Sequence, residues 1–120
     1  MTRKHFVTYK TFDVITVLFP FTDKSSSKRR PALVLSDYSS FNQESQHCVL
    51  AMITSQQHSP WPLDVIINDY KSAGLTTLCT LRMKLFTLDN QLIIRKIGHL
   101  SKSDQLQVSS ALQKLLPFKL

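Results

Sequence analysis

Short apolar runs, rich in β-branched and aromatic residues and separated by polar loops, constrain the fold of this chain more than any other feature. The first two runs are residues 14–19 (VITVLF) and 32–36 (ALVLS), and both predict β-strands. Pro20 limits the first strand, because proline cannot donate to a ladder. The polar loop between the two runs collects four cationic side chains, those of Lys24, Lys28, Arg29 and Arg30. A cationic loop held between two strands suits the binding of a phosphate backbone.

Similar runs predict further strands downstream. Residues 47–54 (HCVLAMIT), 63–67 (LDVII) and 75–85 are the next three, and residues 92–97 predict a short edge strand. Residues 37–46 are polar and predict a loop with one helical turn, and residues 68–74 predict a turn.

The hydrophobic period changes in the tail. Ser101 and Asp104 resemble a capping box, with Asp in place of the usual Glu. An apolar face at helical spacing follows, made by Val108, Ala111, Leu112 and Leu115, and Pro117 ends it. A helix this short must bury its apolar face on the sheet to be stable. We therefore predict a mainly β fold, a small SH3-like barrel of five to seven mostly antiparallel strands with a C-terminal α-helix.

Length and charge bound the class of protein. A chain of 120 residues is expected to form one domain, residues 1–120 with a core at about 13–116. Its net charge of +7 and pI of about 9.7 favour an anionic partner. Composition alone does not choose among a nucleic acid, an acidic protein segment and a membrane surface.

Cysteine usage and hydropathy bound the compartment. Cys48 and Cys79 lie inside apolar runs, which predicts buried, reduced thiols, with a disulfide as the alternative if their strands pair. No Cys-x-x-Cys or His-x-x-x-His spacing is present, so we expect no metal site and no cofactor. No apolar run approaches the roughly 20 residues that span a bilayer, and the basic N-terminus lacks the apolar core of a signal peptide. We expect a cytoplasmic protein without membrane contact.

Six motifs follow one another along the chain: DVITVLFPFTD, KRRPALVLS, LAMITSQ, SAGL, KLFTLDNQLI and IGHLSKSD. In this order and spacing they resemble the MazF/PemK family of toxin–antitoxin toxins, endoribonucleases that cleave messenger RNA. The resemblance implies a barrel-like fold, a homodimer, and a groove for single-stranded RNA near the dimer interface. It also implies a cognate antitoxin whose acidic, disordered tail fills that groove.

The resemblance also implies the catalytic residues. Cleavage without a metal uses the 2′-hydroxyl of the RNA as nucleophile, and an arginine suits the dianionic phosphorane because its planar fork pairs two phosphate oxygens. Arg30 stands in the family's Arg-Pro position, and Thr54 stands where the family carries a catalytic threonine or serine. The alternatives are a solvated charge for Arg30 and an ordinary strand end for Thr54.

Two departures from the family pattern concern proton transfer and the first strand. Arg82, expected at the end of the fifth strand, is a third catalytic candidate, but Lys84 or Met83 stands where some members carry an aspartate. Arg82 and Lys84 form either a cationic phosphate site or a surface strand end. Phe12 replaces the usual glycine before Asp13, so Asp13 is expected to cap the strand or anchor a loop.

The remaining candidates are RNA contacts. Trp61 either stacks on a base or packs over the mouth of the barrel, and His58 either supplies the missing proton carrier or is an exposed loop residue. The full set of expected RNA-binding residues is Lys24, Lys28, Arg29, Ser55, His58, Trp61 and Lys84. The function expected is a metal-independent endoribonuclease. The alternatives are a weak or inactive relative that only binds RNA or antitoxin, and a gyrase poison of the same fold.

Overall fold

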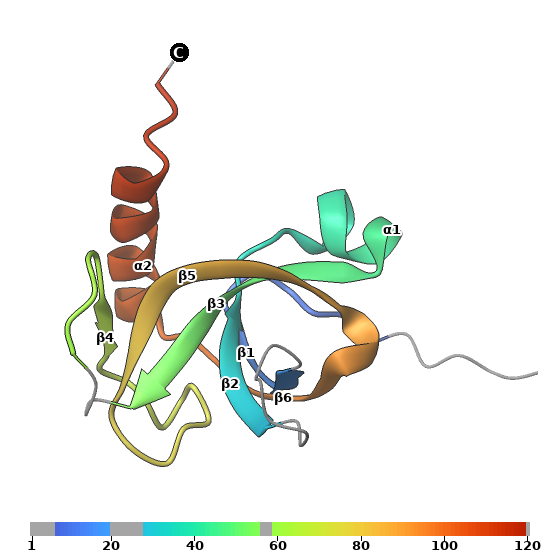
Figure 1. Cartoon of the computed structure of the whole chain (residues 1–120), viewed down its shortest axis with the longest axis horizontal. Helices are drawn as coiled ribbons and strands as arrows, with labels where there is room; N and C mark the ends of the chain where they lie inside the picture. Colours follow the sequence, from blue (N-terminus) through green and yellow to red (C-terminus); the bar gives the residue numbers. More distant parts are fainter. Residues whose placement is uncertain (1–6, 20–27, 56–58, 120) are drawn as a thin grey trace, which may run out of the picture.

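The computed structural model describes residues 7–19, 28–55 and 59–119, and its strands form one antiparallel sheet. The sheet order is β4-β5-β3-β2-β1-β6, and it curls into a half-barrel with the helix α2 (Lys102–Leu115) outside it (Figure 1). The strands are β1 (Asp13–Phe19), β2 (Lys28–Val34), β3 (His47–Ser55), β4 (Val65–Ile67), β5 (Cys79–Asp89) and β6 (Ile93–His99). The prediction of a mainly β barrel closed by a C-terminal helix is confirmed.

Two predicted strands have bounds that are wrong by four residues at one end or at both, whereas the other four are correct to within two residues, and pairing with neighbours explains the two large differences. β2 begins at Lys28 because its ladder with β1 extends to the pair of Phe19 with Lys28, so Lys28, Arg29 and Arg30 lie on a strand and not in a loop. β5 begins later than predicted and continues to Asp89, because a bulge in its ladder lets it follow β3 to His47.

The segment after β2 is more helical than predicted. A π-helical turn, η1 (Tyr38–Asn42), leads into one short turn of α-helix, α1 (Gln43–Ser45). Asp37 caps this segment, because its carboxylate accepts a hydrogen bond of 2.8 Å from the Ser40 amide. A capping carboxylate makes the helical path favourable over an open loop.

The alternation of side chains along the strands produces two hydrophobic clusters. Inside the curl lies a cluster that we call the barrel cluster, which contains Ile15, Val34 and Leu50. On the other face, under α2, lies the helix cluster, which contains Leu33 and Val108. The two faces of the sheet are called the barrel face and the helix face accordingly.

The helix α2 packs as its pattern predicts. Val108 and Ala111 are buried in the helix cluster, and Leu112 and Leu115 pack against it. Ser101 is the N-cap and accepts a hydrogen bond of 3.3 Å from the Asp104 amide, but Asp104 does not complete a reciprocal capping box.

Asp104 binds a turn instead. Its buried carboxylate accepts hydrogen bonds from the amides of Asn68 (3.2 Å) and Asp69 (2.9 Å). The short Asp side chain therefore joins the start of α2 to the turn after β4, which is a contact that the capping motif does not indicate.

Asp13 anchors a loop, as predicted. It is fully buried, accepts a hydrogen bond of 2.8 Å from the Lys10 amide, and lies 2.7 Å from His99 Nδ1 and 3.1 Å from Lys96 Nζ. Phe12 has a φ of 74°, the left-handed conformation that glycine adopts most easily. The backbone thus keeps the glycine-like path while the phenyl ring packs against the helix cluster.

Both cysteines are buried and free, so the prediction of reduced thiols is confirmed and the disulfide alternative is excluded in this structure. Burial raises the pKa of Cys48 to about 11, and the nearby Asp13 carboxylate contributes to the rise. Within the described ranges, no helix is long and apolar enough to cross a membrane.

Candidate nucleic-acid interface

The three expected catalytic residues come from strands that are neighbours in the sheet. Arg30 lies on β2, Thr54 on β3 and Arg82 on β5. Met52 pairs with both Ala32 and Arg82, and paired residues point to the same face, so Arg82 lies on the barrel face with Ala32.

Arg30 and Thr54 lie on that same face. Arg30 is two positions from Ala32 on β2, and Thr54 is two positions from Met52 on β3. Side chains two apart on a strand share a face, and Ala32 and Met52 are paired. The β2–β3 ladder ends at the pair Ala32–Met52, so Arg30 and Thr54 lie just beyond that end, on adjacent strands. The structure therefore brings all three candidates to one end of the barrel face.

Arg30 holds an unused donor at this position. Its side chain is partly buried, and its Nε atom is buried without a hydrogen-bond partner among the described residues. A buried charged donor without a partner is unfavourable, because it has lost water and gained nothing in exchange. An anion bound to Arg30 would remove that cost.

Arg82, in contrast, is bound within the protein. Its Nε donates to Asp64 Oδ1 at 3.2 Å, and one terminal nitrogen donates to Asp64 Oδ2 at 2.9 Å and to the Ser59 carbonyl at 2.6 Å. Only 13% of the Arg82 side chain and 20% of the Asp64 side chain are exposed. The acid that the sequence lacks near Arg82 on β5 is thus present in space, from the residue before β4.

Sequence reasoning missed Asp64 because the register of β4 on β5 was unknown. Val65 pairs with Leu81, so the preceding residue, Asp64, comes opposite Arg82. The only sequence signal was an acidic residue inside the predicted strand 63–67, and it did not reveal its partner.

Trp61 and Lys84 form a second pair beside this ion pair. The Lys84 Nζ atom lies 4.4 Å from the centre of the Trp61 ring, within the range of a cation–π contact. Both side chains are exposed, and the Trp61 amide donates to Asp64 Oδ2 at 3.0 Å. These two expected RNA contacts therefore lie together, next to Arg82.

The other expected RNA contacts are divided between the two faces. Lys28 is exposed and pairs with Phe19, two positions from Arg30 on the barrel face. Arg29 points to the opposite face, and so does Ser55, which pairs with the helix-cluster residue Cys79. Lys24 and His58 lie outside the described residues.

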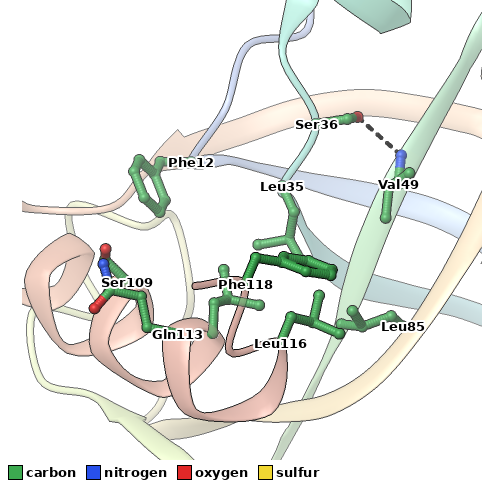
Figure 2. Close-up of a pocket in the computed structure, with 10 residues that line it drawn as sticks. Phe12, Leu35, Ser36, Val49, Leu85, Ser109, Gln113, Leu116 and Phe118 are labelled. Carbon is green, nitrogen blue, oxygen red and sulfur yellow. Dashed lines mark hydrogen bonds between the residues drawn. The ribbon is translucent and has the colours of Figure 1, made fainter. Parts of the chain in front are cut away.

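The helix face carries a pocket of a different character. It has a volume of about 470 Å³ between the sheet and the end of α2, and Figure 2 shows Leu35, Leu85, Leu116 and Phe118 around it. Ser36 Oγ, also on its wall, accepts a hydrogen bond of 2.9 Å from the Val49 amide. None of the ten described residues that line it carries a charge, so it lacks the groups that anion chemistry needs.

The described part of the chain holds no group of three or more His, Cys, Asp or Glu side chains arranged to bind a metal ion. The cationic end of the barrel face, where Arg30 and Arg82 lie, is the candidate site.

A family model matches most of the chain. Residues 10–116 match the model of the PemK-like, MazF-like toxins of type II toxin–antitoxin systems. The chain belongs to this family. Among curated proteins, none is similar enough in sequence to match.

Solved structures of the same family share the fold. MazF from Deinococcus radiodurans is 18% identical with a TM-score of 0.73. The match covers 93% of this chain and 99% of that chain. A chain of a MazE–MazF crystal structure from the same organism is 19% identical with a TM-score of 0.75, and the match covers 94% of this chain and 100% of that chain. A mycobacterial endoribonuclease in complex with its cognate antitoxin is 13% identical with a TM-score of 0.72. The match covers 94% of this chain and 97% of that chain.

Proposed function

We propose that this toxin is a metal-independent endoribonuclease that cleaves single-stranded messenger RNA. The observation that carries the proposal is the buried Nε of Arg30, which has no hydrogen-bond partner among the described residues and belongs to a side chain on the barrel face, the face that Thr54 shares. Membership of the PemK/MazF toxin family supports it, as does the description of a structural neighbour as an endoribonuclease.

The chemistry follows from the two side chains. The 2′-hydroxyl of the RNA loses its proton and attacks the adjacent phosphorus, the bond to the 5′-oxygen breaks, and that oxygen takes up a proton, so the products are a 2′,3′-cyclic phosphate and a 5′-hydroxyl. Arg30 stabilises the extra negative charge of the phosphorane with its guanidinium, and the Thr54 hydroxyl donates to a phosphate oxygen. Donors placed in advance where charge develops commonly supply the largest share of catalysis.

The proposal includes the partners and the compartment. The toxin acts in the cytoplasm as a homodimer, and an antitoxin with an acidic tail covers the cationic end of the barrel face. The net charge of +7 suits both an RNA and an acidic peptide. Neighbours of known structure include toxins bound to MazE or to a cognate antitoxin.

The test is cleavage of a long single-stranded RNA by the purified protein in EDTA, with the fragment ends mapped. We expect discrete cuts by the wild type and none by Arg30→Ala. The Thr54→Val variant should be slower by roughly 10²- to 10³-fold, the usual loss of one donor to a developing oxyanion. Arg95→Ala is the control, because it removes a guanidinium charge from an exposed position on β6, where Arg95 pairs with Thr16 and so points to the face opposite the site.

Intact RNA in every sample would contradict an autonomous nuclease. It would favour a relative that only binds, a gyrase poison, or an enzyme that needs the ribosome. Equal loss of cleavage in Arg95→Ala and Arg30→Ala would show that overall charge, and not the Arg30 position, is what cleavage requires.

A further inference from the structure

The loop before β4 is fastened at both ends to one arginine of β5. Arg82 donates to the Ser59 carbonyl at one end and to the Asp64 carboxylate at the other. Within the loop, the Asp64 amide donates to the Trp61 carbonyl at 3.1 Å, and the Trp61 amide donates back to Asp64 Oδ2. Leu63 has a φ of 65°, so the backbone is held in a closed turn.

These hydrogen bonds leave Arg82 poorly suited to acid–base chemistry. The described hydrogen bonds of Asp64 use both carboxylate oxygens, and they include two from the Arg82 guanidinium in a fork geometry. The ion pair is mostly buried, so breaking it to release either group would be costly. Arg82 is better placed to hold the loop than to move a proton.

The loop that Arg82 holds presents an exposed aromatic ring. Trp61 is 42% exposed, although an indole gains from burial, and its ring faces the Lys84 ammonium. Lys84 lies in the bulge of β5, between Arg82 (paired with Met52) and Leu85 (paired with Ala51), where the ladder leaves it exposed.

A nucleotide matches both groups of this pair. A base can stack on the indole face that Lys84 does not cover, and the adjoining phosphate can take the Lys84 ammonium. We propose that Trp61 and Lys84 form a binding subsite for one nucleotide of single-stranded RNA, and that Arg82 is a positioning residue that sets this subsite beside the phosphate site. The inference rests on the proposed function for the identity of the ligand.

The location agrees with this role. Arg82 lies diagonally from Thr54 across the β3–β5 ladder, where Thr54 pairs with Thr80. Such diagonal neighbours are roughly 7–8 Å apart, about the span of one nucleotide. Lys84 lies two residues beyond Arg82 on β5, so the subsite belongs to a nucleotide near the cleaved bond and not to the cleaved phosphate itself.

The experiment uses the single tryptophan of the chain as its own probe. The ligand is a single-stranded RNA oligonucleotide of mixed sequence, labelled with a dye and carrying 2′-O-methyl groups throughout, so that the attacking hydroxyl is blocked. We expect the oligonucleotide to quench Trp61 fluorescence as it binds, with a Kd matching that from dye anisotropy. Trp61→Ala, a surface change that does not threaten the fold, should raise the anisotropy Kd roughly 10- to 100-fold, and Arg95→Ala should not.

Arg82 is tested by steady-state kinetics on a cleavable RNA and by acrylamide quenching of the free protein. Arg82→Met should raise KM as Trp61→Ala does, leave kcat nearly unchanged, and increase acrylamide access to the indole. Arg82→Lys keeps the positive charge but not the two parallel donors of the guanidinium. Its KM and its acrylamide access should therefore lie between those of Arg82→Met and those of the wild type. A fall in kcat with unchanged KM would place Arg82 at the reacting atoms and overturn the positioning role.

The remaining outcomes separate the two proposals. Binding of the oligonucleotide without any change in Trp61 fluorescence, or no binding at all, would overturn the subsite. Quenching by an oligo-glutamate peptide but not by the RNA would overturn it as well, in favour of a protein partner. Quenching by RNA in a protein that cleaves none would support the subsite while refuting the nuclease.

Discussion

Gly98 should be almost irreplaceable, because a backbone segment from elsewhere in the chain fills the space where a side chain would be. A Cβ atom at Gly98 would lie 2.2 Å from the Ala73 carbonyl carbon, 2.4 Å from its oxygen and 2.6 Å from the Gly74 nitrogen. Carbon atoms in favourable contact are about 3.5 Å apart, so the Ala73–Gly74 peptide would have to move by more than about 1 Å.

That peptide has little freedom to move. Ala73 is fully buried, and its amide donates to the Asp69 carbonyl. The His99 amide, next to Gly98, donates to the Ser72 carbonyl at 3.1 Å, so separating the segments breaks this bond. Overpacking costs about 1–3 kcal/mol and the lost hydrogen bond about 1 kcal/mol, which together predict a loss of about 2–4 kcal/mol for Gly98→Ala.

Urea denaturation followed by circular dichroism measures this loss. With a typical slope of about 2 kcal/mol per molar urea, the midpoint should fall by about 1–2 M. Ser110→Ala, on the exposed face of α2, is the control and should shift the midpoint little. A Gly98→Ala protein with the wild-type midpoint would refute the reasoning, because it would show that the close approach of the two backbones is not required.

Three further changes test other contacts. Asp104→Ala should lower the free energy of unfolding by about 2–4 kcal/mol, since the amides of Asn68 and Asp69 lose an anionic acceptor; urea denaturation beside Asp104→Asn measures it. Cys48 should resist a thiol reagent at pH 8 until the protein unfolds. Because its pKa rises from 9.0 to about 11 on folding, the unfolded chain loses this proton first, and stability should fall from pH 9 to 11 at up to about 1.4 kcal/mol per unit, less so in Cys48→Ala. Phe12→Gly should relieve about 1 kcal/mol of backbone strain but lose more in packing, so the melting temperature should still fall.

The existence of the strands and of the helix could be predicted from local patterns, but their bounds could not. The period of apolar residues in the tail correctly predicts that Val108 and Ala111 are buried, because residues three and four apart lie on the same face of a helix. The start of β2 at Lys28 depends on Phe19 across the ladder, and the end of β5 depends on a bulge against β3. The start of β2 and the end of β5 are both decided by pairing with a neighbouring strand. A single window of sequence does not contain that information.

The same limit applies to the candidate site. The Arg-Pro and Thr-Ser motifs identify Arg30 and Thr54 as candidates, and their roles stay predictions. Asp64 and Arg82 are 18 residues apart and meet only through the register of β4 on β5. A pairing of this kind is a tertiary fact, so the sequence could show that an acid was missing from β5 but not where its replacement lay.

Charge alone makes Arg30 and Arg82 equivalent, and only their surroundings separate them. Both lie on the barrel face, yet Arg82 has a carboxylate and a carbonyl as partners, while the Nε of Arg30 has none among the described residues. A guanidinium that is already neutralised gains little from a phosphate, whereas an unpartnered one gains both a hydrogen bond and relief from its desolvation. The phosphate site should therefore centre on Arg30, and removal of Arg82 should act on RNA affinity through the loop that carries Trp61.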